Sequence, residues 1–342
     1  MKKATLAVIL GISLILGACS TAPEAVPPPE EPSIGSIERL DPALDALIPA
    51  DARIEKVAEG FTFIEGPLWR PAGAVWFSDV IANVIRQWST DGTVTEVLRP
   101  GGYDGNSLPE GGYIGPNGMA AYQDGSVLVC QHGNRRIARI GSDMQVTTFV
   151  DSFEGNRLNS PNDLVFHSDG SLYFTDPPYG LPQADADPMK EIAFNGVYRR
   201  AADGQMRAIV RDITRPNGIA FSPDYKTLYV ANSDENNRVW MAYDVTADGG
   251  AENGRVFADG NASPEAGLPD GLKVDQQGNV YATGPGGVWV LAPDGRHLGT
   301  IKPPEGAANC GWGDDGRTLY ITATTGLYRI RLNVAGMQTL YQ

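Results

Sequence analysis

One pattern recurs six times along the sequence. Each copy has an Asn, Asp or Glu at the start of an apolar run, followed by a turn and a second apolar run, as in PNDLVFHSDGSLYFTD from Pro161 to Asp176. Repeats of about 40 to 50 residues with several short strands each are typical of β-propeller blades. The opening residues, at intervals of 52, 45, 55, 53 and 39 residues, are Glu65, Asn117, Asn162, Asn217, Asp270 and Asn309.

The repeat predicts an all-β fold, a six-bladed β-propeller with four-stranded antiparallel blades. In the first copy we expect the third strand at about 83–89 and the fourth at about 94–98, with a turn at Thr90-Asp91-Gly92. Residues 53–58 resemble a fourth strand, but no first three strands precede them. We therefore expect this N-terminal strand to complete the last blade and close the ring, which removes an exposed sheet edge.

Composition agrees with this fold and argues against one class of partner. The 342 residues include 41 Gly and 25 Pro, and helix-period patterns are nearly absent, as expected for short strands and tight turns. The chain has 27 Lys plus Arg against 41 Asp plus Glu, a net charge of -14. Such a chain repels phosphate backbones, so we expect no nucleic-acid partner. The sequence leaves open a monomer or a dimer.

The N-terminal residues have the pattern of an export signal, and we do not expect them to be part of the fold. Lys2 and Lys3 precede a short apolar run, which predicts a signal peptide over residues 1–18. The run ends in LGAC, which resembles a bacterial lipobox and implies a lipid on Cys19; the alternative is a plain signal peptide with an incidental Cys. Residues 19–37 read as a Pro-rich tether, and 38–342 as the propeller. The expected location is the periplasmic side of the envelope, on the outer membrane, with the lipid as the only membrane contact.

The opening residues of the six copies predict a metal site. First strands line the channel of a propeller, so all six polar side chains are expected at one mouth, here called the top. Each alone could be a turn residue or a strand cap. Together, neighbouring carboxylates repel unless a cation lies between them. Their oxygens suit Ca²⁺ best, with Mg²⁺, Mn²⁺ or Zn²⁺ as alternatives, so we expect one divalent ion near Glu65 and Asp270.

Other candidates are placed by the strand order. His132 ends the second strand of the second blade, on top, as a catalytic or substrate-binding residue or as a structural histidine. Asp176 and Tyr179 lie in a top loop as candidate substrate contacts. Three segments are expected to form the rim of a pocket: 100–116, 181–195 and 259–269. His167 and His297 fall in bottom turns, where no site role is expected. Cys130 and Cys310 could form a disulfide or remain buried thiols.

Five motifs together resemble the gluconolactonase / senescence marker protein / luciferin-regenerating enzyme family: EGPLW, SPNDL, FTDPPYG, RPNGIAFS and PDGL. The resemblance covers about residues 38–335 and is greatest to bacterial gluconolactonases. It implies a catalytic metal held by Glu65, Asn162, Asn217 and Asp270. It also implies that Asp270 is the acid/base residue and that Asn162 contacts substrate. Ser160 stands where the senescence marker protein has a substrate-contacting Arg, so sugar recognition need not be the same.

The resulting functional hypothesis is a metal-dependent hydrolase that opens sugar lactones such as glucono-1,5-lactone. Asp270 or His132 would take the proton from water. Candidate substrate contacts are Asn117, Asn162, Asp176 and Tyr179. Two alternatives stay open: a broad esterase or phosphotriesterase-like hydrolase at the same metal, and a non-catalytic binding propeller. A second, structural calcium beside Asp163, as in the related paraoxonases, is disfavoured because Gly66 stands where another carboxylate would be needed.

Overall fold

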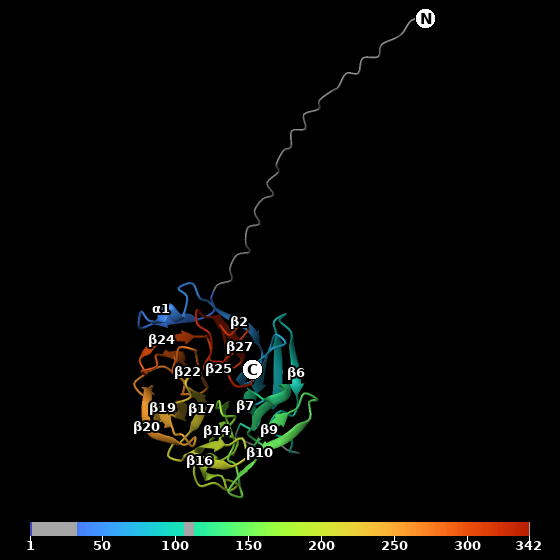
Figure 1. Ribbon diagram of the computed structural model, residues 1–342, viewed down its shortest axis with the longest axis vertical. Helices are drawn as coiled ribbons and strands as arrows, with labels where there is room; N and C mark the ends of the chain where they lie inside the picture. The colour runs from blue at the N-terminus through green and yellow to red at the C-terminus, as the bar shows by residue number, and fades with distance from the viewer. Residues whose placement is uncertain (2–32, 106–112, 342) are drawn as a thin grey trace. The chain divides into compact units, whose positions relative to one another are not determined.

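Six antiparallel sheets, each built on four blade strands, form a ring around a central channel (Figure 1). The computed structural model describes Met1 and residues 33–105 and 113–341, and the ring belongs to the compact unit that starts at Ser33. The predicted all-β, six-bladed fold is confirmed. The predicted signal peptide and Cys19 lie outside the described residues. Within the described part of the chain, none of the helices has the length and apolar character needed to span a membrane.

Each blade follows the chain from the channel outward. The innermost strands, which contact one another around the channel, are β3 (Ile64–Arg70), β7 (Pro116–Ala121), β13 (Leu164–Phe166), β17 (Pro216–Phe221), β21 (Leu272–Val274) and β25 (Ala307–Gly313). The second strands are β4 (Ala74–Asp79), β8 (Val127–Gln131), β14 (Leu172–Asp176), β18 (Thr227–Asp234), β22 (Val280–Gly284) and β26 (Thr318–Ala323). The third strands are β5 (Val84–Ser89), β9 (Arg136–Ile140), β15 (Gly196–Arg200), β19 (Asn237–Val245), β23 (Gly287–Leu291) and β27 (Gly326–Arg331). The fourth strands are β6 (Val94–Leu98), β10 (Val146–Val150), β16 (Met206–Val210), β20 (Ala251–Asp259), β24 (His297–Lys302) and β2 (Ile54–Glu59).

The ring is closed between the two ends of the propeller. Strand β2 from the N-terminal side pairs with β27 from the C-terminal side, with Ile54 opposite Ile330 and Glu59 opposite Gly326. This pairing confirms that an N-terminal strand completes the last blade. It joins the first and last parts of the chain by backbone hydrogen bonds, so the third strand of the last blade, β27, is not left as an open outer edge.

An additional N-terminal element covers the fifth blade and was not predicted. Strand β1 (Ser36–Arg39) adds a fifth strand to this blade, where Ser36 lies opposite Lys302 of β24. The short helix α1 (Leu44–Leu47) follows it. Leu44 and Ile48 are fully buried and join one hydrophobic cluster with side chains of the fifth and sixth blades.

Hydrophobic clusters fill the spaces between neighbouring blades. The fourth and fifth blades meet at Trp240 and Trp289, whose rings lie 5.0 Å apart between centroids. Cys130 and Cys310 are buried in different blades, and both thiols are free. Of the two structures that the sequence allowed for this pair, the described fold has the buried thiols.

Three small elements interrupt the repeat, and the C-terminal segment crosses the bottom of the channel. The three are the β11–β12 hairpin (Ser152–Phe153 and Asn156–Arg157) and the short helices η1 (Gln123–Gly125) and η2 (Ala184–Ala186). After β27 the chain returns beneath the ring, where the backbone N–H of Met337 donates to Val274 O at 2.9 Å. The ring of Tyr341 then packs edge-on against both Tyr122 and Phe166.

Candidate active site

The six opening residues lie at one end of the channel because the inner strands share one direction, and four of these strands are distorted there. In four inner strands the pairing with the second strand shifts at the polar residue: between Glu65 and Leu68, Pro116 and Met119, Pro216 and Ile219, and Ala307 and Asn309. Such bulges redirect a side chain relative to a regular strand. The remaining two residues, Asn162 and Asp270, stand just before β13 and β21.

A glycine follows the polar residue in several copies because neighbouring inner strands approach closely. A Cβ atom on Gly118 would lie 2.6 Å from Asn162 O, and one on Gly218 would lie 2.3 Å from Asp270 O. Any other residue would separate the two backbones. The Asn-Gly pairs of the sequence therefore serve the packing of inner strands as well as the channel mouth.

These strand ends surround a cavity of about 160 Å³ at the top of the channel. All four predicted metal ligands line it, and so do three other predicted site residues. The lining consists of Phe63, Glu65, Val80, Tyr113, Asn117, His132, Asn162, Tyr179, Asn217, Ser233, Leu268 and Asp270. Of the predicted site residues, only Asp176 and Cys19 are missing from it, and Cys19 lies outside the described part. Asn309 also stays out of the lining, although it is buried and its side chain hydrogen-bonds Glu65.

The carboxamides in the cavity are oriented by a chain of hydrogen bonds. Asn117 Nδ2 donates to Asn162 Oδ1 at 2.9 Å, and Asn162 Nδ2 donates to Asn217 Oδ1 at 2.5 Å. Asn217 Nδ2 in turn donates to Ser233 Oγ at 2.9 Å, and this hydroxyl donates to the carbonyl of Pro269. Each amide therefore has a defined direction, and each carboxamide oxygen keeps a second lone pair for another partner.

The two carboxyl groups in the cavity have strongly raised pKa values. Burial raises the pKa of Glu65 to about 7, although hydrogen bonds from Asn309 and the Gly66 N–H oppose this. Burial and the nearby charge of Glu65 raise the pKa of Asp270 well above its usual range, and the two carboxyls lie within hydrogen-bonding reach. Two buried carboxyls at this separation repel when both are ionised, so the pair favours either a proton or a cation between them.

An oxygen-preferring divalent ion fits this arrangement. The Oδ1 atoms of Asp270 and Asn117 are buried without a hydrogen-bond partner, which is costly for an acceptor unless something else satisfies it. Across residues 33–105 and 113–341, no three His, Cys, Asp or Glu side chains gather as a metal cluster. A site here would thus rely on the carboxamide oxygens of Asn162 and Asn217 beside Glu65 and Asp270. That mixture of donors is typical of Ca²⁺ and Mg²⁺ sites.

His132 lies in the wall of the cavity as a neutral imidazole. Its Nδ1 lies 2.8 Å from the carbonyl oxygen of Tyr113, so Nδ1 carries the proton and donates it. Its Nε2 lies 3.3 Å from Asn117 Nδ2 and 3.2 Å from Asn162 Oδ1, at the cavity surface. Burial lowers the pKa of His132 to about 4. The geometry thus directs an unprotonated nitrogen at the centre of the candidate site.

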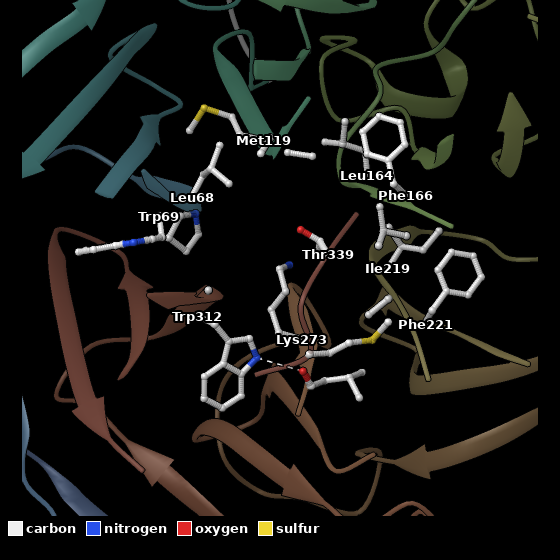
Figure 2. Close-up of a pocket in the computed structure, with 18 of the residues that line it drawn as sticks. Leu68, Trp69, Met119, Leu164, Phe166, Ile219, Phe221, Lys273, Trp312 and Thr339 are labelled. Atoms are coloured by element: carbon white, nitrogen blue, oxygen red, sulfur yellow. Dashed lines mark hydrogen bonds between the residues drawn. The ribbon is translucent and has the colours of Figure 1, made fainter. Parts of the chain in front are cut away.

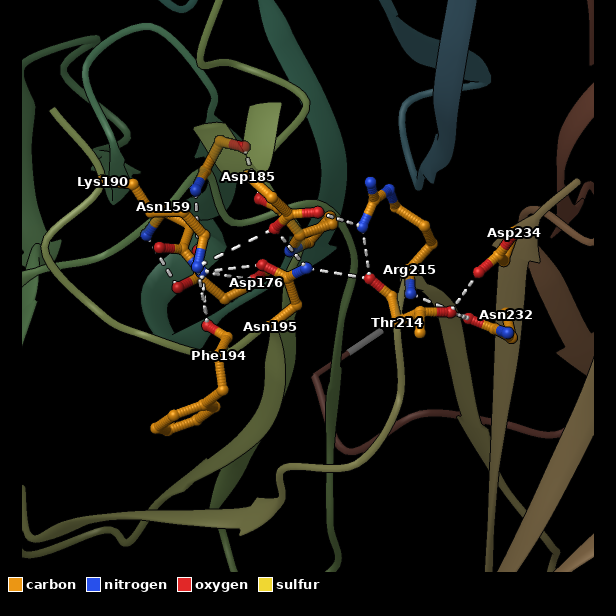
Figure 3. A network of polar contacts seen from close by, with 12 residues as sticks. Asn159, Asp176, Asp185, Lys190, Phe194, Asn195, Thr214, Arg215, Asn232 and Asp234 are labelled. Atoms are coloured by element: carbon orange, nitrogen blue, oxygen red, sulfur yellow. Dashed lines mark hydrogen bonds and ion pairs between the residues drawn. The ribbon is translucent and has the colours of Figure 1, made fainter. Parts of the chain in front are cut away.

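Asp176 lies behind the site. Its two carboxylate oxygens accept the backbone N–H groups of Asn159 and Ser160, each at 2.8 Å, and these residues lead into Asn162. Burial raises the pKa of Asp176 to about 7. Asn159 Nδ2 also reaches the carbonyls of Asp176 and Phe194, within the polar network of Figure 3. In this position Asp176 holds the segment that presents Asn162 and does not border the cavity.

The expected rim segments contribute unequally. Tyr113 from the first and Leu268 from the third line the cavity, whereas the described side chains of 181–195 do not. That segment instead joins the network in Figure 3, where Asn195 Nδ2 donates to Thr214 O at 2.8 Å and Arg215 pairs with Asp185 at 2.5 Å. Residues 106–112 lie outside the described part. The expected positions of His167 and His297 away from the cavity agree with the lining.

Sequence reasoning missed the apolar wall of the cavity. Phe63 packs on Tyr113, with ring centroids 5.7 Å apart, and Val80 and Leu268 complete this side. Ser233, which fixes the direction of Asn217, was also missed. The position of Phe63 two residues before Glu65, on the same face of an extended chain, was the available signal.

Comparison with known proteins identifies the family. The family region described as SMP-30/gluconolactonase/LRE-like matches residues 63–325, which include all six opening residues. The chain belongs to this family. The family resemblance predicted from the five motifs is confirmed.

Individual members of the family match most of the chain. A gluconolactonase of Zymomonas mobilis is 39% identical over 317 residues, which cover 89% of this chain and 88% of that protein. The solved structure of a gluconolactonase from Xanthomonas campestris superposes with a TM-score of 0.76 at 33% identity, over 90% of this chain and 99% of that one. Regucalcin of Agrobacterium tumefaciens, described as a calcium-binding protein, is 18% identical with a TM-score of 0.63 over 84% and 96%, and shares the fold.

Proposed function

We propose that this member of the SMP-30/gluconolactonase/LRE-like family is a metal-dependent hydrolase of sugar lactones, with glucono-1,5-lactone as the first substrate to test. The observation that carries the proposal is the convergence of Glu65, Asn162, Asn217 and Asp270 in one cavity, with the Oδ1 atom of Asp270 lacking a partner. The similarity to gluconolactonases over nearly the whole chain supports the substrate class.

The four ligands and the neighbouring side chains have different proposed roles in the reaction. Glu65, Asn162, Asn217 and Asp270 would hold the ion, which when bound stabilises negative charge on the lactone carbonyl oxygen. The amide of Asn117 would orient the substrate from the wall. Tyr179 has a buried hydroxyl at the same cavity, close to the side chains of Ser233 and Asn217, from which it would donate to a lactone oxygen.

Hydrolysis requires two proton transfers. In the first transfer, a base takes a proton from water while the water oxygen bonds to the carbonyl carbon. In the second, the base gives this proton to the ring oxygen while the carbon–oxygen bond of the lactone breaks. Asp270 suits this role because its Oδ1 lies at the cavity without a partner, and a divalent ion held there would lower its raised pKa and keep the carboxylate ionised, ready to accept a proton. His132 is the competing base, through its unprotonated Nε2. The apolar side formed by Phe63, Val80 and Leu268 limits access of other water.

The cell location belongs to the same proposal. The LGAC sequence that ends at Cys19 supports cleavage before this residue and a lipid on its thiol. Residues 19–37 would then connect the lipid to the propeller on the periplasmic side of the membrane. In that position the enzyme would open lactones produced by sugar oxidation outside the cytoplasm.

One substrate panel tests the proposal against its alternatives. Purified protein would be assayed with glucono-1,5-lactone, an aromatic lactone and paraoxon, with EDTA and after return of Ca²⁺, Mg²⁺, Mn²⁺ or Zn²⁺, and spontaneous hydrolysis would be subtracted. We expect the sugar lactone to be preferred, activity to disappear in EDTA and one divalent ion to restore it. Full activity in excess EDTA would refute the metal dependence. Preference for paraoxon would favour the phosphotriesterase alternative, and no turnover of any substrate would favour a binding propeller.

A further inference from the structure

We propose that Lys273 acts as a fixed cation in the channel, that is, as a positive charge supplied by the chain itself. Its ammonium group neutralises Asp163 below the four proposed ligands, so that the remaining charge of the cluster matches one divalent ion. The inference rests on the proposed metal site and goes beyond it. It assigns a positioning role to a residue that lies outside the cavity at the top.

Lys273 extends from the inner strand β21 into the middle of the ring, as Figure 2 shows. Its Nζ donates to the carbonyl of Leu272 at 3.0 Å and lies 3.7 Å from Asp163 Oδ2. The Asp163 side chain is 3% exposed and that of Lys273 is 28% exposed. The ammonium group thus stands beside a deeply buried carboxylate, at a distance that permits an ion pair.

The space below this pair is apolar. A cavity of about 90 Å³ occupies the lower channel, and among the side chains that line it Lys273 is the one that carries a charge. Around it stand Met119, Leu164 and Ile219, with Met337 of the C-terminal segment also in the lining (Figure 2). A cation in such surroundings is unfavourable without a paired anion, whereas the four methylene groups of Lys suit the apolar wall. These surroundings favour an ammonium group directed at Asp163.

Asp163 completes a cluster of three carboxyls. Its Oδ1 accepts the Leu164 N–H at 2.8 Å, but its Oδ2 is buried and has no hydrogen bond. It is adjacent in sequence to Asn162, and its charge acts on both Glu65 and Asp270. When all three carboxyls are ionised, they carry a charge of -3, and one ammonium reduces this to -2. One divalent ion would neutralise the cluster, and a second would leave it with excess positive charge.

This arrangement also accounts for a single proposed metal. The alternative of a second, structural calcium beside Asp163 would require a cation where the Lys273 ammonium already stands. The lysine supplies that charge from within the chain. Removal of the Lys273 charge distinguishes this role from that of an ordinary structural ion pair. If the pair only supported the structure, its loss would weaken metal binding. If the ammonium group acts as a positive charge near the ligands, its loss strengthens metal binding.

Metal titration of four variants tests the inference. Chelator-treated protein would be titrated calorimetrically with whichever of Ca²⁺, Mg²⁺, Mn²⁺ and Zn²⁺ the wild type binds most tightly. For Lys273→Met we expect a second bound ion or about tenfold tighter binding of the first, because a positive charge near the ligands is lost. For Lys273→Arg, which keeps the charge, we expect binding within about twofold of wild type.

The carboxylate variants test the same charge from the other side. For Asp163→Asn we expect about tenfold weaker binding, because the unpaired ammonium group then repels the ion. The double variant Asp163→Asn/Lys273→Met should return to one ion and to within about threefold of the wild-type affinity, since the two groups act as a pair. Asp163→Asn gives an independent result if Lys273→Met does not fold, and a thermal melt establishes folding of each variant.

Two results would overturn the inference. Unchanged or weaker metal binding in Lys273→Met, with one ion bound by the wild type, would refute the role of Lys273 and leave the proposed metal site intact. A wild-type chain that binds none of the four ions would refute the metal site and the role of Lys273 together.

Discussion

Asp270 and His132 are the two residues that could accept the proton from water, and the structure gives them different properties. Asp270 has a carboxyl oxygen without a partner at the cavity and a pKa well above its usual range. His132 has a pKa lowered to about 4 by burial, which keeps it neutral at pH 7 but makes it a weaker base. The unpartnered Oδ1 of Asp270 and the low pKa of His132 favour Asp270 as the proton acceptor, even though a divalent ion bound to Asp270 would lower the pKa of its carboxyl.

The substitution Asp270→Asn separates proton transfer from metal binding. It keeps an oxygen near the metal but removes the proton acceptor, so we expect the variant to retain the ion while kcat falls by roughly 10²–10⁴. The matched control is Glu65→Gln, which should mainly weaken metal binding and regain activity at high metal concentration. Elemental analysis and steady-state kinetics measure both effects. Near wild-type turnover of metal-saturated Asp270→Asn would rule out Asp270 as the base.

For His132→Gln we expect a smaller effect. The Gln would still be able to hydrogen-bond Asn117, and loss of about one hydrogen bond should lower kcat/KM by roughly five- to tenfold. The shape of the pH profile between pH 5 and 8 should not change, because the imidazole is already neutral throughout this range. Should the acid limb of the profile disappear in His132→Gln, the imidazole would be the acceptor.

At the scale of elements, the repeat describes the blades but not the segments added to them. Strand β1 and helix α1 belong to no copy of the repeat, yet Leu44 of α1 is fully buried against the fifth and sixth blades. The loop at Asn159 and Ser160 is likewise held by Asp176 from a neighbouring strand end. The first contact stabilises the ring from outside the repeat, and the second ties a loop outside the repeat to the end of the blade strand β14.

The substitution Leu44→Ala tests whether the N-terminal element is part of the fold. Removal of a fully buried Leu side chain should lower the free energy of unfolding by about 2–5 kcal/mol. The matched control is Leu40→Ala in the same segment, where the side chain is 55% exposed and little change is expected. Denaturant unfolding of the two variants measures the difference. Equal stability of Leu44→Ala and wild type would show that β1 and α1 do not contribute to the stability of the propeller.

At the scale of the whole molecule, buried carboxyls link stability to pH and metal. Burial raises the pKa of Glu65 to about 7, against about 4.3 for an unfolded chain. Between these values the native state binds a proton that the unfolded state has released, so this group lowers the free energy of unfolding as the pH rises. A bound divalent ion would offset the loss, because it favours the ionised carboxyl and binds only the native state.

Glu65→Gln should therefore change stability in opposite directions with and without metal. In EDTA we expect the Tm of Glu65→Gln to be slightly above that of wild type at pH 5, to exceed it increasingly up to about pH 7, and to keep this lead at pH 8. In excess metal at pH 8 the order should reverse, because the variant binds the ion more weakly. Scanning calorimetry at both pH values measures the two Tm values. Comparison of the variant with wild type removes the contribution of the surface carboxyls, which the two proteins share. A wild-type protein more stable than Glu65→Gln in EDTA at pH 8 would contradict the expected pKa.

The anchor is also a property of the whole molecule. For Cys19→Ser we expect the protein to move from the membrane fraction to the soluble periplasm with unchanged specific activity, because the lipid site is separate from the propeller. Fractionation of cells and an assay of each fraction measure this. The matched control is Cys130→Ser, which changes a buried thiol in β8 and should leave the membrane fraction unchanged. Wild-type protein found entirely in the soluble fraction would refute the anchor.

The sequence by itself determined the ring and the residues at its mouth. The repeat is a local pattern: an apolar strand has the same alternation wherever it lies, and the polar residue and the glycine after it are adjacent in the chain. Six copies predict six blades, and an unaccompanied fourth strand at residues 53–58 predicts closure at β2. Because inner strands share one direction, the positions of Glu65, Asn162, Asn217 and Asp270 followed from strand order alone.

Only the tertiary structure decided which side chains touch. Asp176 stands in the predicted loop, but its carboxylate turns toward backbone N–H groups of Asn159 and Ser160 and away from the cavity. In the sequence, Lys273 is one polar residue in a strand. Its approach to Asp163, 110 residues earlier, depends on how the third, fourth and fifth blades are arranged around the channel. Contacts of this kind depend on side-chain direction and on distances between remote segments. Neither side-chain direction nor the distance between remote segments produces a periodic pattern in the sequence. These contacts are therefore known only from the tertiary structure.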